Sequence, residues 1–260
     1  MVIDSFGARS AKEIIDAAHE ALRKPNISKA KYLRQARRRN WIGVFGTSGS
    51  PGISSISLNL AAELSQHTST HIVDADIRNQ DLHILLGARR EGRSILTPSL
   101  SFMTIASDQD RINLMSEPSQ LCVLDIGESP SLHDEVFTDR RSSVRDTLDL
   151  ITQSHNLVYI LQPENRALTE LDAFLTFAER ELSHHEITFL LNKMGSSNRH
   201  KAILRSLKNR IADRALFVLP QDNALFDRAK ARYATLGEVG ARSSARRTIA
   251  ELSIYLAKSF

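Results

Sequence analysis

The sequence predicts an α/β protein with a doubly wound, mostly parallel sheet of about seven strands flanked by helices. Short apolar runs alternate with helical patterns from Trp41 to the end of the chain. Several of these runs are nearly continuous in Val, Ile, Leu and Phe, which is typical of strands that helices cover on both faces. No apolar run is long enough to cross a membrane.

Period and length separate the strands from the helices. The predicted strands are 41–45, 71–76, 102–107, 121–127, 156–163, 186–194 and 215–220. The predicted helices are roughly 54–66, 140–154, 166–183, 198–213, 222–233 and 243–258. The last helix places Ile249, Leu252, Leu256 and Phe260 near one face, so we expect it to pack on the sheet rather than to bind a membrane.

Residues 1–40 differ from the rest and predict a helical extension with a basic linker, ahead of a single domain at 41–260. Ser10 and Glu13 form a capping pattern before an amphipathic stretch. The segment SKAKYLRQARRRN that follows is rich in Lys and Arg. It is either a solvated linker or an arm that docks on acidic lipid, nucleic acid or a protein.

Composition narrows the class of protein. The chain has 260 residues, a formal net charge of +4 and one cysteine, Cys122, in an apolar run. A single cysteine excludes an internal disulfide, and we expect it to be a buried small hydrophobic residue. The N-terminus lacks the apolar core of a signal peptide, so a cytoplasmic protein is expected. The mild positive charge permits contact with nucleic acid or an anionic membrane without indicating either.

The segment GTSGSPGISS, residues 46–55, has the outline of a phosphate-binding loop between a strand and a helix. Its glycines let the backbone turn sharply, and the helix that follows would direct free amides and a positive end into the loop. Ser54 and Ser55 supply hydroxyls where such a loop needs a Mg²⁺ ligand. Because Ile53 replaces the consensus lysine, a plain glycine-bearing turn remains the alternative.

Polar residues end three later strands. Asp74 and Asp76 end HIVDAD, Asp125 follows LCVL, and Asn192 follows FLL. Ligands of such sheets bind at the carboxyl ends of the strands. A buried carboxylate is costly unless it meets a cation or several donors, so Asp125 has the pattern of a Mg²⁺ ligand, and Asn192 could pair with an adenine edge. The alternatives are a helix cap at Asp76 or Asp81 and a turn at Asn192.

Together, GTSGSPGISSISLNLAAEL, HIVDADIRNQDLHILLG, LCVLDIG and LLNKM resemble the MinD/ParA family of deviant Walker-type P-loop ATPases, over about residues 41–258. The loop and the tail that begins LPQDNALF look most like the CpaE/TadZ branch, which is associated with Flp/Tad pilus assembly and polar positioning. The resemblance implies a face-to-face homodimer that binds ATP with Mg²⁺. It would work in the cytoplasm, at the inner face of the membrane or at a cell pole.

The same resemblance implies roles for individual residues. Ser54 and Asp125 would hold Mg²⁺, and Asp76 would position the attacking water. The nucleotide would be contacted by Gly49, Ser50, Pro51, Gly52, Ile53, Ser54, Ser55, Asn192, Pro220 and Asp222.

Two departures from the family pattern concern charge. Ser48 and Ile53 stand where active members carry lysines. Losing cations that neutralise phosphoryl charge slows phosphoryl transfer. Each loss of about 1.4 kcal/mol of transition-state stabilisation lowers the rate tenfold. We therefore expect nucleotide binding with slow or absent hydrolysis, in a protein that positions or regulates a pilus, secretion, division or partition machine. The alternatives are an active partition ATPase that binds DNA non-specifically, and a scaffold that binds no nucleotide.

Overall fold

The computed structural model describes residues 39–76, 78–116, 120–129 and 142–260. The predicted N-terminal helix and nearly all of the basic linker lie outside the described residues. The first strand begins at Arg39, and the Arg39 guanidinium lies 5.2 Å from the centre of the Trp41 ring.

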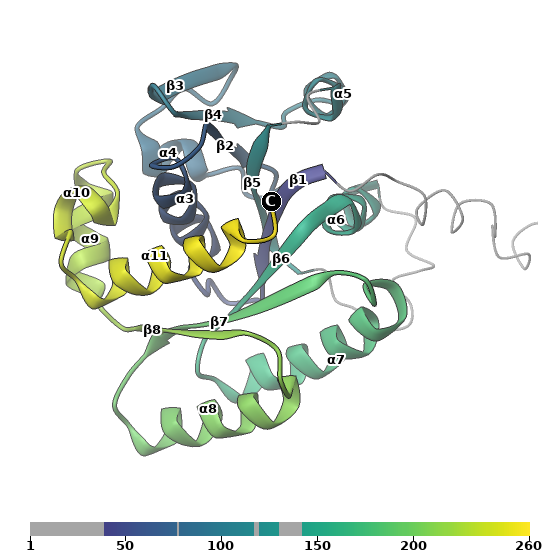
Figure 1. Cartoon of the computed structure of the whole chain (residues 1–260), viewed down its shortest axis with the longest axis vertical. Coiled ribbons are helices and arrows are strands. Elements are labelled where there is room, and N and C mark those ends of the chain that lie inside the picture. The colour runs from purple at the N-terminus through teal and green to yellow at the C-terminus, as the bar shows by residue number, and fades with distance from the viewer. Residues whose placement is uncertain (1–38, 77, 117–119, 130–141) are drawn as a thin grey trace, which may run out of the picture. The chain divides into compact units, whose positions relative to one another are not determined.

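The described residues form eight strands and nine helices (Figure 1). The strands are β1 (Arg39–Gly46), β2 (Thr70–Asp74), β3 (Arg93–Thr97), β4 (Leu100–Thr104), β5 (Leu121–Glu128), β6 (Ser154–Leu161), β7 (Glu186–Met194) and β8 (Leu216–Pro220). The helices are α3 (Ile53–Leu64), α4 (Leu82–Leu86), α5 (Asp108–Ser116), α6 (Ser142–Gln153), α7 (Asn165–Glu181), α8 (Asn198–Ile211), α9 (Asn223–Ala231), α10 (Leu236–Gly240) and α11 (Ser244–Ala257).

The strands form one sheet in the order β3-β4-β2-β5-β1-β6-β7-β8. Every neighbouring pair is parallel except β3 and β4, which are antiparallel. The predicted α/β class with a mostly parallel sheet is therefore confirmed. The sequence patterns did not indicate β3, because this edge strand is short and alternates exposed and half-exposed side chains rather than forming an apolar run.

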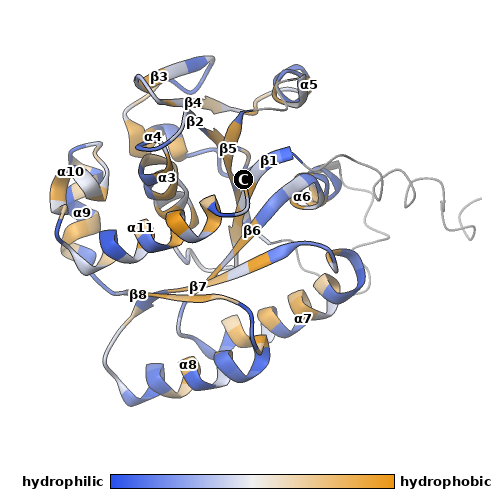
Figure 2. Cartoon of the chain, in the orientation of Figure 1, coloured by the Kyte–Doolittle hydropathy of each residue, from blue (hydrophilic) through white to orange (hydrophobic). Residues whose placement is uncertain are grey.

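Helices cover both faces of the sheet. The α3, α4, α9, α10 and α11 helices lie on one face, and α5, α6, α7 and α8 lie on the other (Figure 1). The helices that pack on the sheet turn their apolar sides inward, and this is most visible for α7, α8 and α11 (Figure 2). Each face has its own apolar core, and the sheet separates the two. Among the described residues, no helix is both long enough and apolar enough to span a bilayer.

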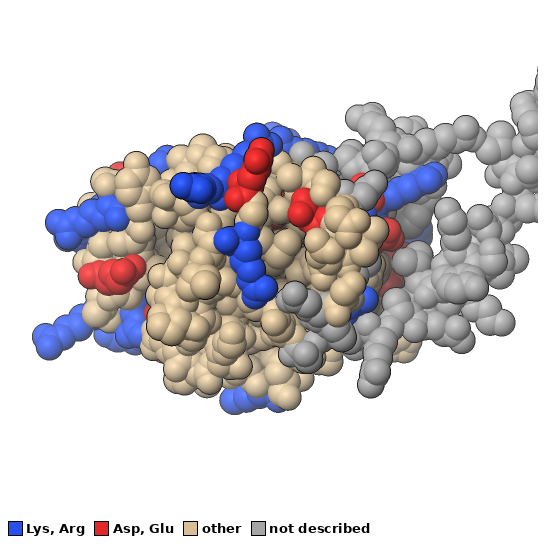
Figure 3. Space-filling model, turned by 90° about the horizontal axis from the view of Figure 1, so that it is seen from above, with Lys and Arg blue, Asp and Glu red and all other residues tan. Residues whose placement is uncertain are grey.

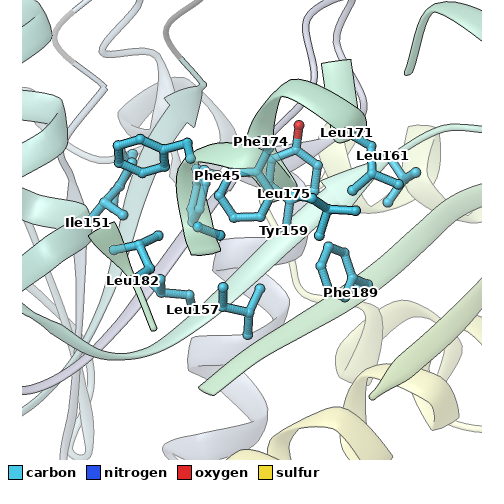
Figure 4. Close-up of a cluster of buried hydrophobic side chains, with 14 of the residues drawn as sticks. Phe45, Ile151, Leu157, Tyr159, Leu161, Leu171, Phe174, Leu175, Leu182 and Phe189 are labelled. Atoms are coloured by element: carbon cyan, nitrogen blue, oxygen red, sulfur yellow. The ribbon is translucent and has the colours of Figure 1, made fainter. Parts of the chain in front are cut away.

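An aromatic cluster fills the core beneath α7 (Figure 4). The rings of Tyr159 and Phe174 stack with their centres 4.2 Å apart. The ring of Phe45 lies 5.4 Å from each of them at a steep angle, and the ring of Phe189 closes the group. These contacts connect β1, β6, β7 and α7, so they fix the strand from which the phosphate-type loop leaves.

The second core confirms the prediction for the C-terminal helix. The α11 side chains Ile249, Leu252 and Leu256 are fully buried against the sheet and α3. Phe260 lies beyond the end of the helix and is 48% exposed, so it does not continue this apolar face. Cys122 is buried, as expected for a small core residue.

We expect Phe174→Ala to lower the free energy of unfolding by about 3–5 kcal/mol, because it removes a ring with no exposed surface from the centre of the aromatic cluster. Urea unfolding followed by circular dichroism measures this. The control is Ile254→Ala, at an exposed position on α11, which should change stability by no more than about 0.5 kcal/mol. Equal losses in the two variants would contradict the assignment of this cluster as the core.

Candidate functional site

The loop from Thr47 to Gly52 leaves β1 at the middle of the sheet and leads directly into α3. Its last residue needs to be glycine for two reasons. Gly52 has a φ of 93°, and a Cβ atom there would lie 2.6 Å from the side-chain nitrogen of Asn192. The loop and β7 therefore approach each other more closely than any side chain at Gly52 would allow.

The start of α3 has the features of an anion site. No side chain caps the helix among the described residues, and its first turn holds no acidic residue. The amides at the start of a helix lack intrahelical partners and carry the positive end of the helix dipole. The loop therefore places uncapped donors at the carboxyl end of the central strand β1, as the sequence predicted.

Ile53, at the position of the consensus lysine, faces the interior. Its side chain is 6% exposed and belongs to the core beneath α3 and α11. The replacement is therefore more than a lost charge, because this position contributes to packing.

Two residues at the end of β7 hold the loop. The Asn192 side-chain nitrogen donates to the Pro51 carbonyl at 2.7 Å, and the Asn192 side-chain oxygen accepts from the Lys193 amide at 2.8 Å. The Lys193 ammonium donates to the Ser50 carbonyl at 2.7 Å. Asn192 is 4% exposed, and its amide is engaged by the loop in this structure. Sequence reasoning missed Lys193, since its contact joins residues 143 positions apart.

A cavity of about 280 Å³ opens beside this contact. Its walls come from the loop, the start of α3, the end of β7 and the segment from β8 into α9, and its lining includes Gly52, Ser55, Asn192, Lys193, Pro220 and Asp222. The volume is close to the lower end of the range for small-molecule sites. Asp222 also caps α9, because its carboxylate accepts from the Leu225 amide at 3.1 Å. The structure thus brings five predicted nucleotide contacts into one concave surface.

Two buried carboxylates lie side by side, one at the end of β2 and one within β5. Asp74 and Asp125 are register partners, and both are almost fully buried. Burial raises the pKa of Asp125 to about 8. The nearby Ser54 hydroxyl favours the ionised carboxylate, although it makes no hydrogen bond to it, and the charges of nearby aspartates favour the protonated form. Burial likewise raises the pKa of Asp74 to about 7. Within the described part of the chain, neither carboxylate oxygen of Asp125 has a hydrogen-bond partner.

The chemistry of Asp125 fits a divalent cation, because a cation would compensate a buried carboxylate that has no hydrogen-bond partner among the described residues. No group of three His, Cys, Asp or Glu side chains among the described residues is arranged to hold a metal alone. A Mg²⁺ ion at Ser54 and Asp125 would therefore need further oxygen ligands from phosphate and water, which is how Mg²⁺ is commonly bound.

Asp76 is fixed at the turn after β2. Its carboxylate accepts from the Arg78 amide at 2.9 Å and from the backbone and side chain of Asn79 at 3.3 and 3.2 Å. It lies against Gly127 of β5, where a Cβ atom would be 2.3 Å from it. Asp81 is the N-cap residue of α4, as one alternative expected, but its side chain makes no cap bond. The carboxylate of Asp74 instead accepts from the Leu82 amide at 3.0 Å.

Two glutamates from outside the loop accept hydrogen bonds from its first half, and no sequence pattern indicated these contacts. The Ser48 amide donates to Glu170 of α7 at 2.7 Å, and the Ser48 hydroxyl donates to the same carboxylate. The Gly49 amide donates to Glu128, at the end of β5, at 2.9 Å. Burial would raise the pKa of Glu170, but the bonds from Ser48 and Arg166 outweigh it and hold the pKa below its ordinary value.

No protein-family model and no curated protein matches this sequence. Solved structures do match. A ParA family ATPase from Chlorobium tepidum superimposes with a TM-score of 0.63 at 18% identity, over 85% of this chain and all of that one. MinD from Pyrococcus horikoshii with Mg-ADP gives 0.62 at 14% identity, over 85% and 97%. A Cyanothece McdA variant with ATP gives 0.64 at 13% identity, over 86% and 97%.

The chain has the fold of the ParA and MinD ATPases. Within this ParA/MinD fold, the loop, Asp76, Asp125 and Asn192 all lie at the carboxyl edge of the sheet, where the sequence analysis expected them. Ser54 adjoins Asp125, whereas Asn192 contacts the loop and the cavity. Their roles toward a nucleotide stay predictions.

The buried aspartates predict an unusual pH dependence in the metal-free protein. Folded Asp74 and Asp125 keep protons that the unfolded chain releases above 3.8, so the free energy of unfolding should fall as the pH rises toward 8. The slope should reach about 1.4 kcal/mol per pH unit for each group. Urea unfolding in EDTA at pH 5, 6, 7 and 8 measures it. Asp125→Asn should make the profile shallower by removing the contribution of one group, and Asp213→Asn, at an exposed site, should not; a flat wild-type profile would exclude this explanation.

Proposed function

We propose that this chain is an adenine-nucleotide-binding protein of the ParA/MinD type that positions or regulates a larger cellular assembly. The observation that carries the proposal is the uncapped start of α3 beside Asp125, a buried carboxylate with no partner in the described part of the chain. The cavity at Asn192 and Pro220 adds room for a nucleoside next to these groups. Two of the matched proteins are described with Mg-ADP or ATP bound.

The residues suggest how the nucleotide would be held. Amides in the first turn of α3 would donate to phosphate oxygens, and the helix dipole would favour their negative charge. Ser54 and Asp125 would hold Mg²⁺, which supplies charge neutralisation when it is bound. The base and ribose would lie in the cavity between the loop and the segment at Pro220 and Asp222.

Slow or absent hydrolysis is part of the proposal. Asp76 is held by three donors and could orient a water, which the resemblance also implies. The two loop lysines that would neutralise the transferring phosphoryl group are replaced, because position 48 is serine and position 53 is an isoleucine that faces the core. Lys193 does reach the loop, but its ammonium is engaged by the Ser50 carbonyl.

The finer role follows the sequence resemblance to the CpaE/TadZ branch. We propose a homodimer that binds ATP with Mg²⁺ and acts with a protein partner of a Flp/Tad pilus or secretion apparatus, in the cytoplasm, at the inner face of the membrane or at a cell pole. Division and partition machines are other candidate partners for a ParA/MinD-type protein.

A second candidate, a DNA-binding partition ATPase, is favoured by one observation. The α8 helix carries exposed Lys and Arg side chains at positions 199, 201, 205 and 208, outside its buried stripe. On the face shown in Figure 3, Lys and Arg are instead scattered among acidic and uncharged side chains. DNA binding that weakens steeply with salt, together with brisk hydrolysis, would favour this candidate over the first.

Nucleotide binding is testable by thermal unfolding. With millimolar ADP or ATP and Mg²⁺, the melting temperature should rise, since a ligand at a hundred times its Kd stabilises the native state by about 2.7 kcal/mol. Asp125→Asn should keep the fold and lose the part of the shift that requires Mg²⁺. Asp213→Asn serves as the matched control. An unchanged melting curve with every nucleotide would support the scaffold alternative instead.

Turnover is tested separately, by phosphate release from ATP at saturation. We expect a rate well below the roughly 1–1000 s⁻¹ of ordinary enzymes. Asp76→Ala should remove any residual hydrolysis while leaving the nucleotide-induced melting shift in place. A rate of several per second in the wild-type protein, lost in Asp76→Ala, would show that the loop does not need the lysines.

A further inference from the structure

The two ends of the phosphate-type loop differ in what lies beside them. The cavity borders Gly52 and Ser55, at the start of α3. Going backward along the chain from Gly52, the loop passes Gly49 and Ser48, which lie beside the end of β5 and Glu170 in the second turn of α7. A phosphate chain that begins at a nucleoside in the cavity would therefore meet the α3 amides first and the Ser48 and Gly49 amides at its far end.

The donors at this far end already have anionic acceptors. Glu170 receives the Ser48 amide and hydroxyl, and Glu128 receives the Gly49 amide. A terminal phosphoryl group would need the same donors, and it would face two carboxylates. Like charges at close range oppose binding. The pKa of Glu170, held below its ordinary value, keeps that carboxylate ionised at neutral pH.

The surrounding contacts fix this arrangement. Arg166 donates to Glu170 at 2.9 Å from one turn earlier on α7. Gln162, after β6, donates to the Gly49 carbonyl at 3.1 Å. Displacing Glu170 would break its bonds to Ser48 and Arg166 together. The first turn of α3, in contrast, has no cap from any described side chain.

We propose that Glu128 and Glu170 close the far end of the phosphate loop, so that this site takes a nucleoside diphosphate in preference to a triphosphate. The inference rests on the proposed nucleotide site and narrows its ligand. A diphosphate extends along the α3 amides and leaves both carboxylates in place. A triphosphate binds only when its last phosphoryl group displaces them.

The test is the ratio of the ATP and ADP dissociation constants, measured by calorimetry with Mg²⁺ at moderate salt. In the wild-type protein, ADP should bind at least tenfold more tightly than ATP. The double variant Glu128→Ala/Glu170→Ala should bring the ratio close to one, mainly by tightening ATP. Glu179→Ala, at an exposed position on the same helix as Glu170, should leave the ratio unchanged.

A conservative variant separates charge from folding. Glu170→Gln keeps an acceptor for Ser48 but removes the charge, so its ratio should lie between those of the wild-type and double-alanine proteins at an unchanged melting temperature. The inference is overturned, and the nucleotide site stands, if wild-type protein binds ATP as tightly as ADP or if the variants leave the ratio unchanged. If neither nucleotide binds the wild-type or the variant proteins, the proposed function itself fails and the inference fails with it.

Discussion

The hydrogen bond from Asn192 to the Pro51 carbonyl is the contact on which the site depends. It brings β7 against the loop so closely that Gly52, the residue just before α3, must be glycine. The cavity lies beside the same contact, and Lys193, the next residue, reaches the loop apex. A single buried amide therefore aligns the start of the helix, the loop and the cavity. The aromatic core beneath β1 and α7 keeps the strand that carries the loop in register with the rest.

Charge divides the site into two halves. At the α3 end, Asp125 is buried without a partner in the described residues, and the helix presents uncapped amides. At the other end, Glu128 and Glu170 satisfy loop amides. The first half is suited to a cation and an anion bound together, because each charge reduces the unfavourable free energy of burying the other. In the second half, carboxylates of the chain itself already accept hydrogen bonds from the loop amides.

Much of the fold could be predicted, because strands covered on both faces are continuous apolar runs and the helices between them keep a clear period. The short edge strand β3 lacked that signal. In the site, Asp125 and Asn192 were found because a polar residue at the end of an apolar strand is conspicuous. Glu128, Glu170 and Lys193 were not, because their contacts with the loop join residues 79 to 143 positions apart and no local pattern marks them.

The buried position of Ile53 has a consequence for any attempt to restore the consensus loop. Its side chain belongs to the same apolar core as Leu252 and Leu256 of the C-terminal helix. A lysine at this position would bury its aliphatic stem, and with it the ammonium group, in that core, and an unpaired buried charge is costly. Restoring the cation is therefore not a one-residue change: the packing under α3 and α11 would have to be redesigned together with the loop.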